Sequence, residues 1–466
     1  MATPSAETST SPPVPPEGAV DLVHDQTAPP SGSEPNTARR FLNRLKGLLQ
    51  AYGPGVITGA ADDDPSGIAT YAQTGAQFGY GQLWTAVFML PLQTAVQEAC
   101  ARIGAVTGQG ISSVVRERYG KSVLYSMAVL LLVANTINIG ADLGAMASAA
   151  DLLVPIPFGI ATVLFAGAIL LLEIFSSYRV YSRILRWLAI SLFAYPLTVV
   201  IMAEPWDEIV RATFVPHIEL TFGFIFIITG VLGTTISPYM FFWEASEEVE
   251  EEEAHGVGKV DGRPAIGRAY LASLLGDNLV GMLVSEIATW SIIVVGATAL
   301  HNNGQTHIET AADVARALEP LVQSFPNAGM LAQLIFASGI LGLGFLAVPV
   351  LSGSAAYALS EAFNWPEGLA RTLKQAPGFY GVIAVATAAG LALNYIGVNP
   401  IQALVYTAVI NGVVAVPLLF LVARLAERRD IMGEAASGWL SRTLVWLTFA
   451  AMAAAAIAMF ATIGRT

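Results

Sequence analysis

The feature that most limits how this chain can fold is a run of three aspartates, Asp62, Asp63 and Asp64, inside the apolar stretch 47–75. An aspartate at the centre of a lipid-facing helix costs about 2.5–3.5 kcal/mol, so three would cost roughly 8–10 kcal/mol. An ordinary membrane helix does not tolerate such a cost. We therefore expect the carboxylates to turn away from lipid and toward a polar interior.

The residues after the aspartates favour a break in the helix. Pro65 has no amide hydrogen to donate, and Gly67 tolerates unusual backbone dihedrals. Carbonyl groups released by the break would line a polar cavity beside the carboxylates, which together suit a cation. The alternative is a solvated loop between two short spans.

Composition indicates a protein that crosses a membrane many times. Of 466 residues, 54 % are hydrophobic and only 12 % are charged, which is too few charges to cover a soluble globule of this size. The net charge of −12 argues against a nucleic-acid partner, and a single cysteine, Cys100, excludes an intrachain disulfide framework. Residues 1–38 are polar and rich in Pro and Ser, which predicts a disordered cytoplasmic tail.

The domain at 39–466 is predicted to contain eleven transmembrane helices. Their apolar stretches lie at 47–75, 82–106, 122–150, 153–175, 184–203, 219–243, 267–300, 328–360, 377–397, 399–424 and 441–463. With a cytoplasmic N-terminus, all of the 23 basic residues except Arg211, Arg316 and Arg465 fall on the cytoplasmic side. This distribution follows the positive-inside rule and predicts a multi-pass protein of the cell (inner) membrane.

The sixth stretch, 219–243, contains a second predicted break, at Pro238. The first and sixth stretches both carry an Ile-Thr-Gly triplet followed by a proline within about ten residues, a pattern expected of interrupted helices in matching repeats. We therefore expect two inverted repeats, at about 47–203 and 219–424, and a peripheral helix at about 441–463. The alternative for the second break is a proline kink whose backbone groups are recaptured by nearby hydroxyls.

Four stretches resemble the Nramp family of divalent-metal transporters, and the resemblance extends over nearly the whole chain after residue 45. They are 53–70, 99–120, 134–149 and 399–434, which look like the family's first helix, the end of its second, its third, and its tenth with the loop after it. The resemblance implies an all-α membrane protein of eleven transmembrane helices, with a LeuT-like inverted five-plus-five repeat and broken helices 1 and 6.

In that family a transition metal binds to an Asp and an Asn of the first helix, an Ala carbonyl and a Met of a Met-Pro-His motif. Asp64 and Ala61 match the Asp and the Ala. An Asn, a Met, a His and a metal-facing Gln of the family are replaced by Gly67, Ser237, Tyr239 and Ala408, respectively. The departures remove a soft thioether and two amides, which implies a wider and harder site.

The family's proton route is also incomplete. Asp142 matches its third-helix Asp, but Ala145 stands where a Glu would be, and 377–397 contains no arginine. This pattern is similar to the Nramp-related magnesium transporter branch, and it implies transport without obligatory proton coupling.

The residue chemistry leads to the same preference. All five histidines fall in predicted tails or loops, so only carboxylate, hydroxyl, carbonyl and water oxygens are available, and these suit Mg²⁺, Mn²⁺ or Ca²⁺. The predicted roles are a neutralising carboxylate from Asp64, carbonyls from Ala61 and Thr234, a hydroxyl from Ser237, and contacts to the hydration shell from Asp62 or Asp63. Met240 near the second break is expected to pack rather than bind.

Other acidic residues within or next to the predicted spans could also serve the cation path. Glu98 either lines the cation path or pairs with Arg102, while Asp142 is a candidate for the path because no basic residue lies near it in sequence. Glu286 is a weaker candidate, since Ser285 and Thr289 could satisfy it locally. The seven glutamates of 244–253 form either a solvated helix face or a cation sensor.

The sequence thus predicts an importer of divalent cations, with Mg²⁺ preferred and Mn²⁺ accepted, that works by alternating access in the lipid bilayer. The alternatives are a proton-coupled Mn²⁺ symporter of the same fold and a membrane cation sensor that does not transport. No phosphate-binding loop or catalytic motif is visible, so an enzyme is not expected. No cofactor is expected beyond the transported ion, and a monomer is compatible with the sequence.

Overall fold

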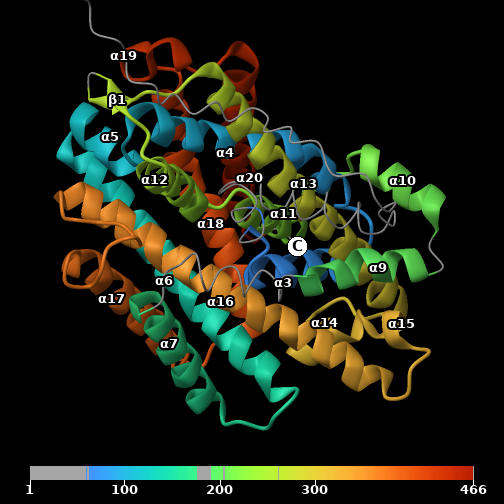
Figure 1. The fold of residues 1–466 in the computed structure, drawn as a ribbon. Helices are drawn as coiled ribbons and strands as arrows, with labels where there is room; N and C mark the ends of the chain where they lie inside the picture. Colours follow the sequence, from blue (N-terminus) through green and yellow to red (C-terminus); the bar gives the residue numbers. More distant parts are fainter. Residues whose placement is uncertain (1–58, 60–61, 176–189, 203–204, 261, 465–466) are drawn as a thin grey trace, which may run out of the picture. The chain divides into compact units, whose positions relative to one another are not determined.

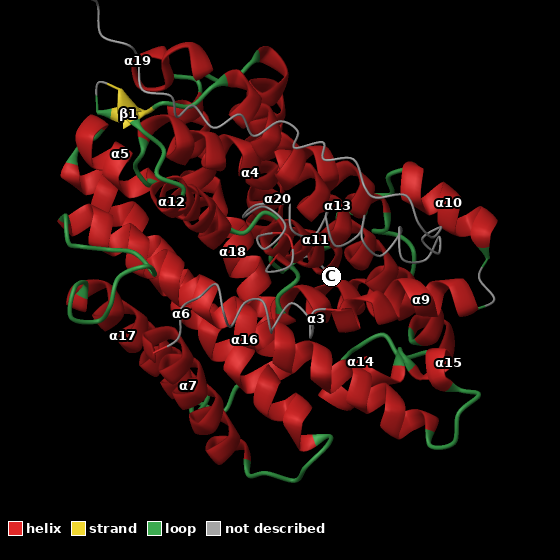
Figure 2. Ribbon diagram, viewed as in Figure 1, coloured by secondary structure: helices red, strands yellow, loops and turns green. Residues whose placement is uncertain are grey.

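The computed structural model describes residues 59, 62–175, 190–202, 205–260 and 262–464. The predicted tail at 1–38 and the predicted ligand Ala61 lie outside this part of the chain. The described residues are almost entirely helical (Figures 1 and 2). The exception to the predicted all-α fold is a short antiparallel hairpin of β1 (Lys259–Val260) and β2 (Arg263–Pro264), where Gly262 supplies a positive φ of 79° for the turn.

The longer helices follow the apolar stretches of the sequence. They are α3 (Pro65–Phe78), α4 (Trp84–Thr107), α6 (Lys121–Asp151), α7 (Phe158–Phe175), α11 (Phe222–Thr235), α12 (Pro238–Ala254), α13 (Arg268–Ala299), α16 (Ala328–Phe363), α17 (Pro377–Leu393), α18 (Pro400–Ala426) and α20 (Trp439–Thr462). The short ones are α5 (Ile111–Arg118), η1 (Ile190–Phe193), α9 (Ala194–Ile201), α10 (Trp206–Phe214), η2 (His301–Asn303), α14 (Ala311–Arg316), α15 (Glu319–Val322), α19 (Arg429–Met432) and η3 (Gly433–Ala435).

Seven segments of the described chain are long and apolar enough to cross a membrane. They are α6, α7, α11 together with α12, α13 with η2, α16, α18 and α20. The other predicted spans fall short of that length or hydropathy: α3 and α9 adjoin undescribed residues, α17 has 17 residues, and α4 carries Gln93, Gln97, Glu98 and Arg102. The exact number of eleven therefore stays a prediction.

A helix begins at the proline of each predicted break. α3 begins at Pro65, directly after the non-helical Asp63 and Asp64, and Asp64 has an extended ψ of 171°. α11 ends at Thr235, and α12 begins at Pro238 after the extended Ser237, whose ψ is 136°. A proline at the first position of a helix has no amide to leave unpaired, so each proline favours a new helix start.

Close helix contacts hold these starts in the interior. α11 packs against α18 so tightly that a Cβ on Gly233 would lie 2.1 Å from the Ala408 carbonyl oxygen, and α3 approaches α13 where a Cβ on Gly75 would lie 2.3 Å from the Ile293 carbonyl oxygen. Small residues permit this approach, as they do in other membrane helix pairs.

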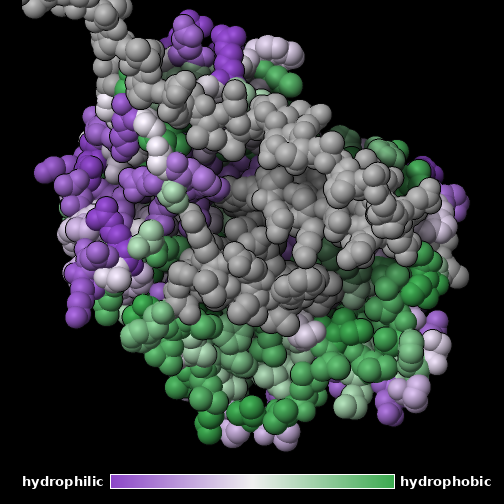
Figure 3. All heavy atoms as spheres, viewed as in Figure 1, coloured by the Kyte–Doolittle hydropathy of each residue, from purple (hydrophilic) through white to green (hydrophobic). Residues whose placement is uncertain are grey.

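One region of the protein surface has exposed apolar side chains, which are suited to contact with lipid. Figure 3 shows hydrophobic atoms gathered over α7, α16 and α9, and hydrophilic atoms gathered near α5, α12 and α19. Leu164 and Leu171 of α7 and Val200 of α9 are exposed apolar side chains. A bilayer is the solvent in which such an exposed apolar face is favourable.

Candidate functional site

The site is built around the carboxylate of Asp64, which is 1 % exposed and caps the N-terminus of α3. Its Oδ1 accepts hydrogen bonds from the Ser66 hydroxyl at 2.6 Å and the Gly67 amide at 2.8 Å. Both donors become available because the backbone is extended at Asp64 and then enters the first turn of α3. The local sequence thus fixes the carboxylate against its own helix start.

Side chains from three other helices surround the same carboxylate. Asn138 of α6 donates to Oδ2 at 3.0 Å, Tyr239 of α12 donates to Oδ2 at 3.5 Å, and Thr234 of α11 donates to Oδ1 at 3.5 Å. The Ser66 and Thr234 hydroxyl oxygens are 3.3 Å apart, and the Tyr71 and Thr235 hydroxyls are 2.8 Å apart. The start of α3 therefore meets the junction between α11 and α12, as the pairing of the two predicted breaks requires.

Asp142 lies on α6 one turn after Asn138, which places both side chains on one face of the helix. Asp142 is 0 % exposed, neither of its carboxylate oxygens has a hydrogen-bond partner among the described residues, and it interacts electrostatically with Asp64. Asp142 thus lacks hydrogen-bond partners among the described residues, while the packing of α6 against α3 brings its charge within reach of Asp64.

The positions that depart from the family pattern lie close to Asp64 or to the helix junction. A Cβ on Gly67 would lie 3.2 Å from the Tyr71 ring and 3.3 Å from the Thr234 hydroxyl, so glycine leaves space that a larger residue would fill. Ser237 donates its hydroxyl hydrogen to the carbonyls of Gly233 at 2.9 Å and Thr234 at 2.6 Å, which leaves its oxygen lone pairs unused by those bonds. Ala408 lies where α18 touches Gly233.

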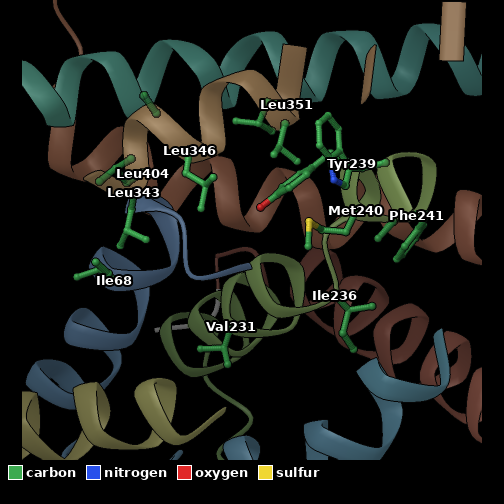
Figure 4. Close-up of a cluster of buried hydrophobic side chains, with 14 of the residues drawn as sticks. Ile68, Val231, Ile236, Tyr239, Met240, Phe241, Leu343, Leu346, Leu351 and Leu404 are labelled. Atoms are coloured by element: carbon green, nitrogen blue, oxygen red, sulfur yellow. The ribbon is translucent and has the colours of Figure 1, made fainter. Parts of the chain in front are cut away.

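A cluster of buried side chains from the helices of this junction and their neighbours is drawn in Figure 4. Tyr239 and Met240 of α12, both 0 % exposed, belong to a buried cluster that includes residues of α3, α16 and α18. The labelled members of that cluster from these three helices are Ile68, Leu343, Leu346, Leu351 and Leu404. Low polarity around a charge strengthens its attraction for a cation that enters.

Asp62 and Asp63 have a different hydrogen-bond partner from Asp64, although their charges interact with it. The Ser285 hydroxyl of α13 lies 2.9 Å from Asp62 Oδ2 and 3.2 Å from Asp63 Oδ1. The three consecutive aspartates therefore face different helices: Asp64 contacts α6, α11 and α12, while Asp62 and Asp63 contact α13.

Glu98 and Glu286, two further acids considered in the sequence analysis, each contact another side chain in the structure. Glu98 is in an ion pair with Arg102, whose Nε donates at 2.7 Å, and it also accepts from Ser441 at 3.3 Å. This is the second of its two interpretations, so we leave Glu98 out of the proposed path. Neither Ser285 nor Thr289 satisfies Glu286, contrary to expectation; its Oε1 accepts from Gln93 of α4 at 3.0 Å.

The acidic run at 244–253 is not simply a solvated face. Glu250 accepts hydrogen bonds from the Leu369 amide at 2.6 Å, the Ala370 amide at 3.2 Å and the Tyr357 hydroxyl. Glu248 accepts from the Tyr270 hydroxyl. These bonds tie α12 to α16, to the loop after it, and to α13.

Sequence reasoning missed three polar neighbours of the aspartates: Ser66, Asn138 and Ser285. The signal for Asn138 was present, because an amide four residues before a buried aspartate on an apolar helix shares its face. Ser285 could not be assigned to Asp62 from sequence, because the contact joins residues separated by 223 positions.

Comparison with known proteins decides the family. The model of the family described as natural resistance-associated macrophage protein-like (Nramp) matches residues 55–462. The chain belongs to the Nramp family. The curated divalent metal cation transporter MntH of Deinococcus radiodurans is 26 % identical to this Nramp chain over 405 residues, 84 % of each protein.

Solved structures support the fold of this Nramp protein. The crystal structure of the Eremococcus coleocola manganese transporter in complex with an aromatic bis-isothiourea compound has a TM-score of 0.67 at 16 % identity, covering 95 % of this chain and 91 % of the other. The nucleobase-cation-symport-1 family transporter Mhp1, in a closed conformation, gives 0.51 at 14 % identity, with 88 % and 91 % covered. The fold is thus that of helical membrane transporters of the LeuT-like class. The Nramp relatives are transporters, which confirms the expectation that the chain is not an enzyme.

Proposed function

We propose that this Nramp protein imports divalent cations into the cytoplasm, preferring Mg²⁺ and accepting Mn²⁺, by alternating access between two inverted five-helix repeats. The observation that carries the proposal is the buried Asp64 carboxylate, which Asn138, Thr234 and Tyr239 approach from three other helices. A carboxylate at the junction of interrupted helices is the usual position of a transporter cation site. In the proposed alternating-access mechanism, an ion bound there would contact both repeats, which move relative to one another.

The proposed ligands are oxygen atoms only. Asp64 neutralises charge, Ala61 and Thr234 supply carbonyls, Ser237 supplies a hydroxyl, and water completes the shell. The C-terminal end of α11 adds the negative end of a helix dipole, because its last carbonyls have no partner within the helix. Hard oxygen ligands with retained waters are the preferred environment of Mg²⁺.

We further infer that import is not obligatorily coupled to protons. Ala145 and Tyr239 do not offer the acid and imidazole of the family's proton route, and the part of 377–397 that forms α17 contains no arginine. The inside-negative potential alone is worth about 4.6 kcal/mol per 100 mV for a divalent ion, twice the value for one charge. That energy is sufficient for accumulation without a second ion.

A second candidate is proton-coupled Mn²⁺ symport. Two observations favour it. Relatives of this chain are described as MntH and as a manganese transporter. Asp142 is buried, has no hydrogen-bond partner among the described residues, and lies within electrostatic reach of Asp64. A sensor that does not transport is less well supported, because hydrogen bonds within the protein account for Glu248 and Glu250 of its acidic run.

Flux into proteoliposomes without nucleotide separates these functions. We expect uptake of Mg²⁺ and Mn²⁺, Mg²⁺ competing with Mn²⁺, and no Mg²⁺-dependent acidification reported by an internal pH dye. Acidification that follows uptake and disappears in Asp142→Asn would establish the symporter instead. Uptake blocked by Cd²⁺ and insensitive to Mg²⁺ would refute the Mg²⁺ preference, and absence of flux with retained binding would indicate a sensor.

A further inference from the structure

A second group of buried acids lies beside the Asp64 site and has its hydrogen-bond partners on α13 and α4. Asp62, Asp63 and Glu286 are 0 %, 1 % and 5 % exposed, and their charges interact with one another. They lie where α13 packs against both α3 and α4. Ser285 bridges the two aspartates, and Gln93 of α4 contacts Glu286.

Within the described residues, these acids have more acceptor atoms than the hydrogen-bond donors that contact them. The single Ser285 hydrogen is shared between Asp62 and Asp63, and the Gln93 amide serves one oxygen of Glu286. Asp62 Oδ1 and Glu286 Oε2 have no hydrogen-bond partner among the described residues. Buried acceptors without donors are costly, so something else must satisfy them.

Neighbouring amide and hydroxyl groups are unsatisfied as well. The Gln93 Oε1, both polar side-chain atoms of Gln97, and the Thr289 Oγ1 are buried and without partners in the described structure. Gln93 and Gln97 share a face of α4, and Ser285 and Thr289 share a face of α13, because each pair is four residues apart. The unpartnered Gln93 oxygen belongs to the same amide that donates to Glu286, so it lies beside the acids.

The described residues also supply no ion-pair partner for these acids. None of the ion pairs within the described part of the chain involves Asp62, Asp63 or Glu286. Removing an unpaired charge from water costs several kcal/mol for each ion, and a bound cation would offset that cost. Among the described residues, no group of three or more acidic, imidazole or thiol side chains is placed to hold a metal ion as its direct ligands. A cation that keeps its water shell does not need such a group, and the amide and hydroxyl groups would contact those waters.

We propose that Asp62, Asp63 and Glu286, with Ser285 and Gln93, form a second site for a hydrated divalent cation, separate from the Asp64 site. This inference rests on the proposed transport of divalent cations, because the same ion would pass between the two sites. It assigns Asp62 and Asp63 to the α13 side of α3 rather than to the hydration shell of the ion at Asp64.

Equilibrium binding of Mn²⁺ to the full-length protein in detergent, followed by the loss of the free-ion electron paramagnetic resonance signal, tests the second site. Glu286→Gln keeps the size of the side chain and removes its charge. We expect it to bind one Mn²⁺ fewer per chain than wild type, and Asp64→Asn to lose one independently. The double variant is expected to lose both ions.

The controls separate the two proposals. Glu286→Asp keeps the charge and should keep the wild-type stoichiometry, while elution as a single monodisperse peak shows that each variant is folded. If Glu286→Gln does not fold, Gln93→Leu provides the second test and should weaken only the second binding event. Unchanged stoichiometry in Glu286→Gln, or loss of all binding in Asp64→Asn, overturns the second site. Absence of Mn²⁺ binding to wild type would instead overturn the proposed function.

Discussion

The Asn138 amide donates to Asp64 Oδ2 at 3.0 Å, which joins the middle of α6 to the start of α3. This bond orients the carboxylate toward the junction of α11 and α12. Asn138→Ala should raise the Mg²⁺ concentration for half-maximal uptake roughly tenfold or more, because a hydrogen bond to a charged group is worth about 1.5–3 kcal/mol. Asn135→Ala is the control, because Asn135 donates instead to the Leu351 carbonyl at 2.8 Å. Equal effects of both variants would contradict the role of Asn138.

The space at Gly67 should influence which ion is preferred. An asparagine there would place its Cβ 3.2 Å from the Tyr71 ring and 3.3 Å from the Thr234 hydroxyl, and its amide beside Asp64. The site becomes narrower and leaves fewer positions for water, which disfavours Mg²⁺. In Gly67→Asn we expect the ratio of Mn²⁺ to Mg²⁺ uptake, measured in the same liposomes, to rise several-fold. An unchanged or lower ratio would show that this space does not set selectivity.

The contact between α11 and α18 should be sensitive to a single methyl group. A Cβ on Gly233 would lie 2.1 Å from the Ala408 oxygen and 2.2 Å from the Gly412 nitrogen, both backbone atoms. Gly233→Ala should therefore destabilise the protein by about 1–3 kcal/mol or prevent folding, as overpacking does. Gly167→Ala on α7 has no neighbour within 4 Å and should be neutral or slightly stabilising. Thermal unfolding in detergent compares the two variants.

The loop after α16 should make stability depend on pH. Burial, and then the charge of Glu361, raise the pKa of Glu367 to about 9, although Arg116 and Arg371 act in the opposite direction and Glu250 adds to the rise. Because the folded pKa lies above the ordinary value of 4.5, the folded state binds the proton more tightly, so this group lowers stability progressively as pH rises from about 4.5 to about 9.

Glu367→Gln removes that penalty. We expect the variant to unfold at a higher temperature than wild type at pH 8, with little difference at pH 5. Glu319→Gln, in the short helix α15, is the control for removing a carboxylate at another position. A difference between Glu367→Gln and wild type that is the same at both pH values would refute the raised pKa.

Much of the site could be predicted from sequence because its chemistry is local. Asp64 is followed directly by the proline that starts α3, and Ser237 by the proline that starts α12, so the helix boundaries were readable. The helices that the three aspartate side chains contact could not be predicted from sequence. Non-helical backbone at Asp63 and Asp64 sends neighbouring side chains toward different helices, and the sequence does not state which helix lies on which side.

Hydrogen bonds between residues far apart in the sequence could not be predicted either. Gln93 meets Glu286 across 193 positions, and this contact exists only because α4 and α13 pack together. The family resemblance indicated the proposed ligand positions but gave no information on Glu286, which is not among the residues matched to the family.

The most direct test of the account is initial Mg²⁺ uptake by proteoliposomes containing Asp64→Asn, at matched protein density and with an imposed inside-negative potential. The matched control is Asp430→Asn, because the Asp430 side chain is 51 % exposed and pairs with Arg428 away from the proposed site. We predict that Asp64→Asn reduces uptake to the level of empty liposomes while Asp430→Asn transports like wild type. Uptake by Asp64→Asn at the wild-type rate would contradict the central claim that Asp64 binds the transported ion.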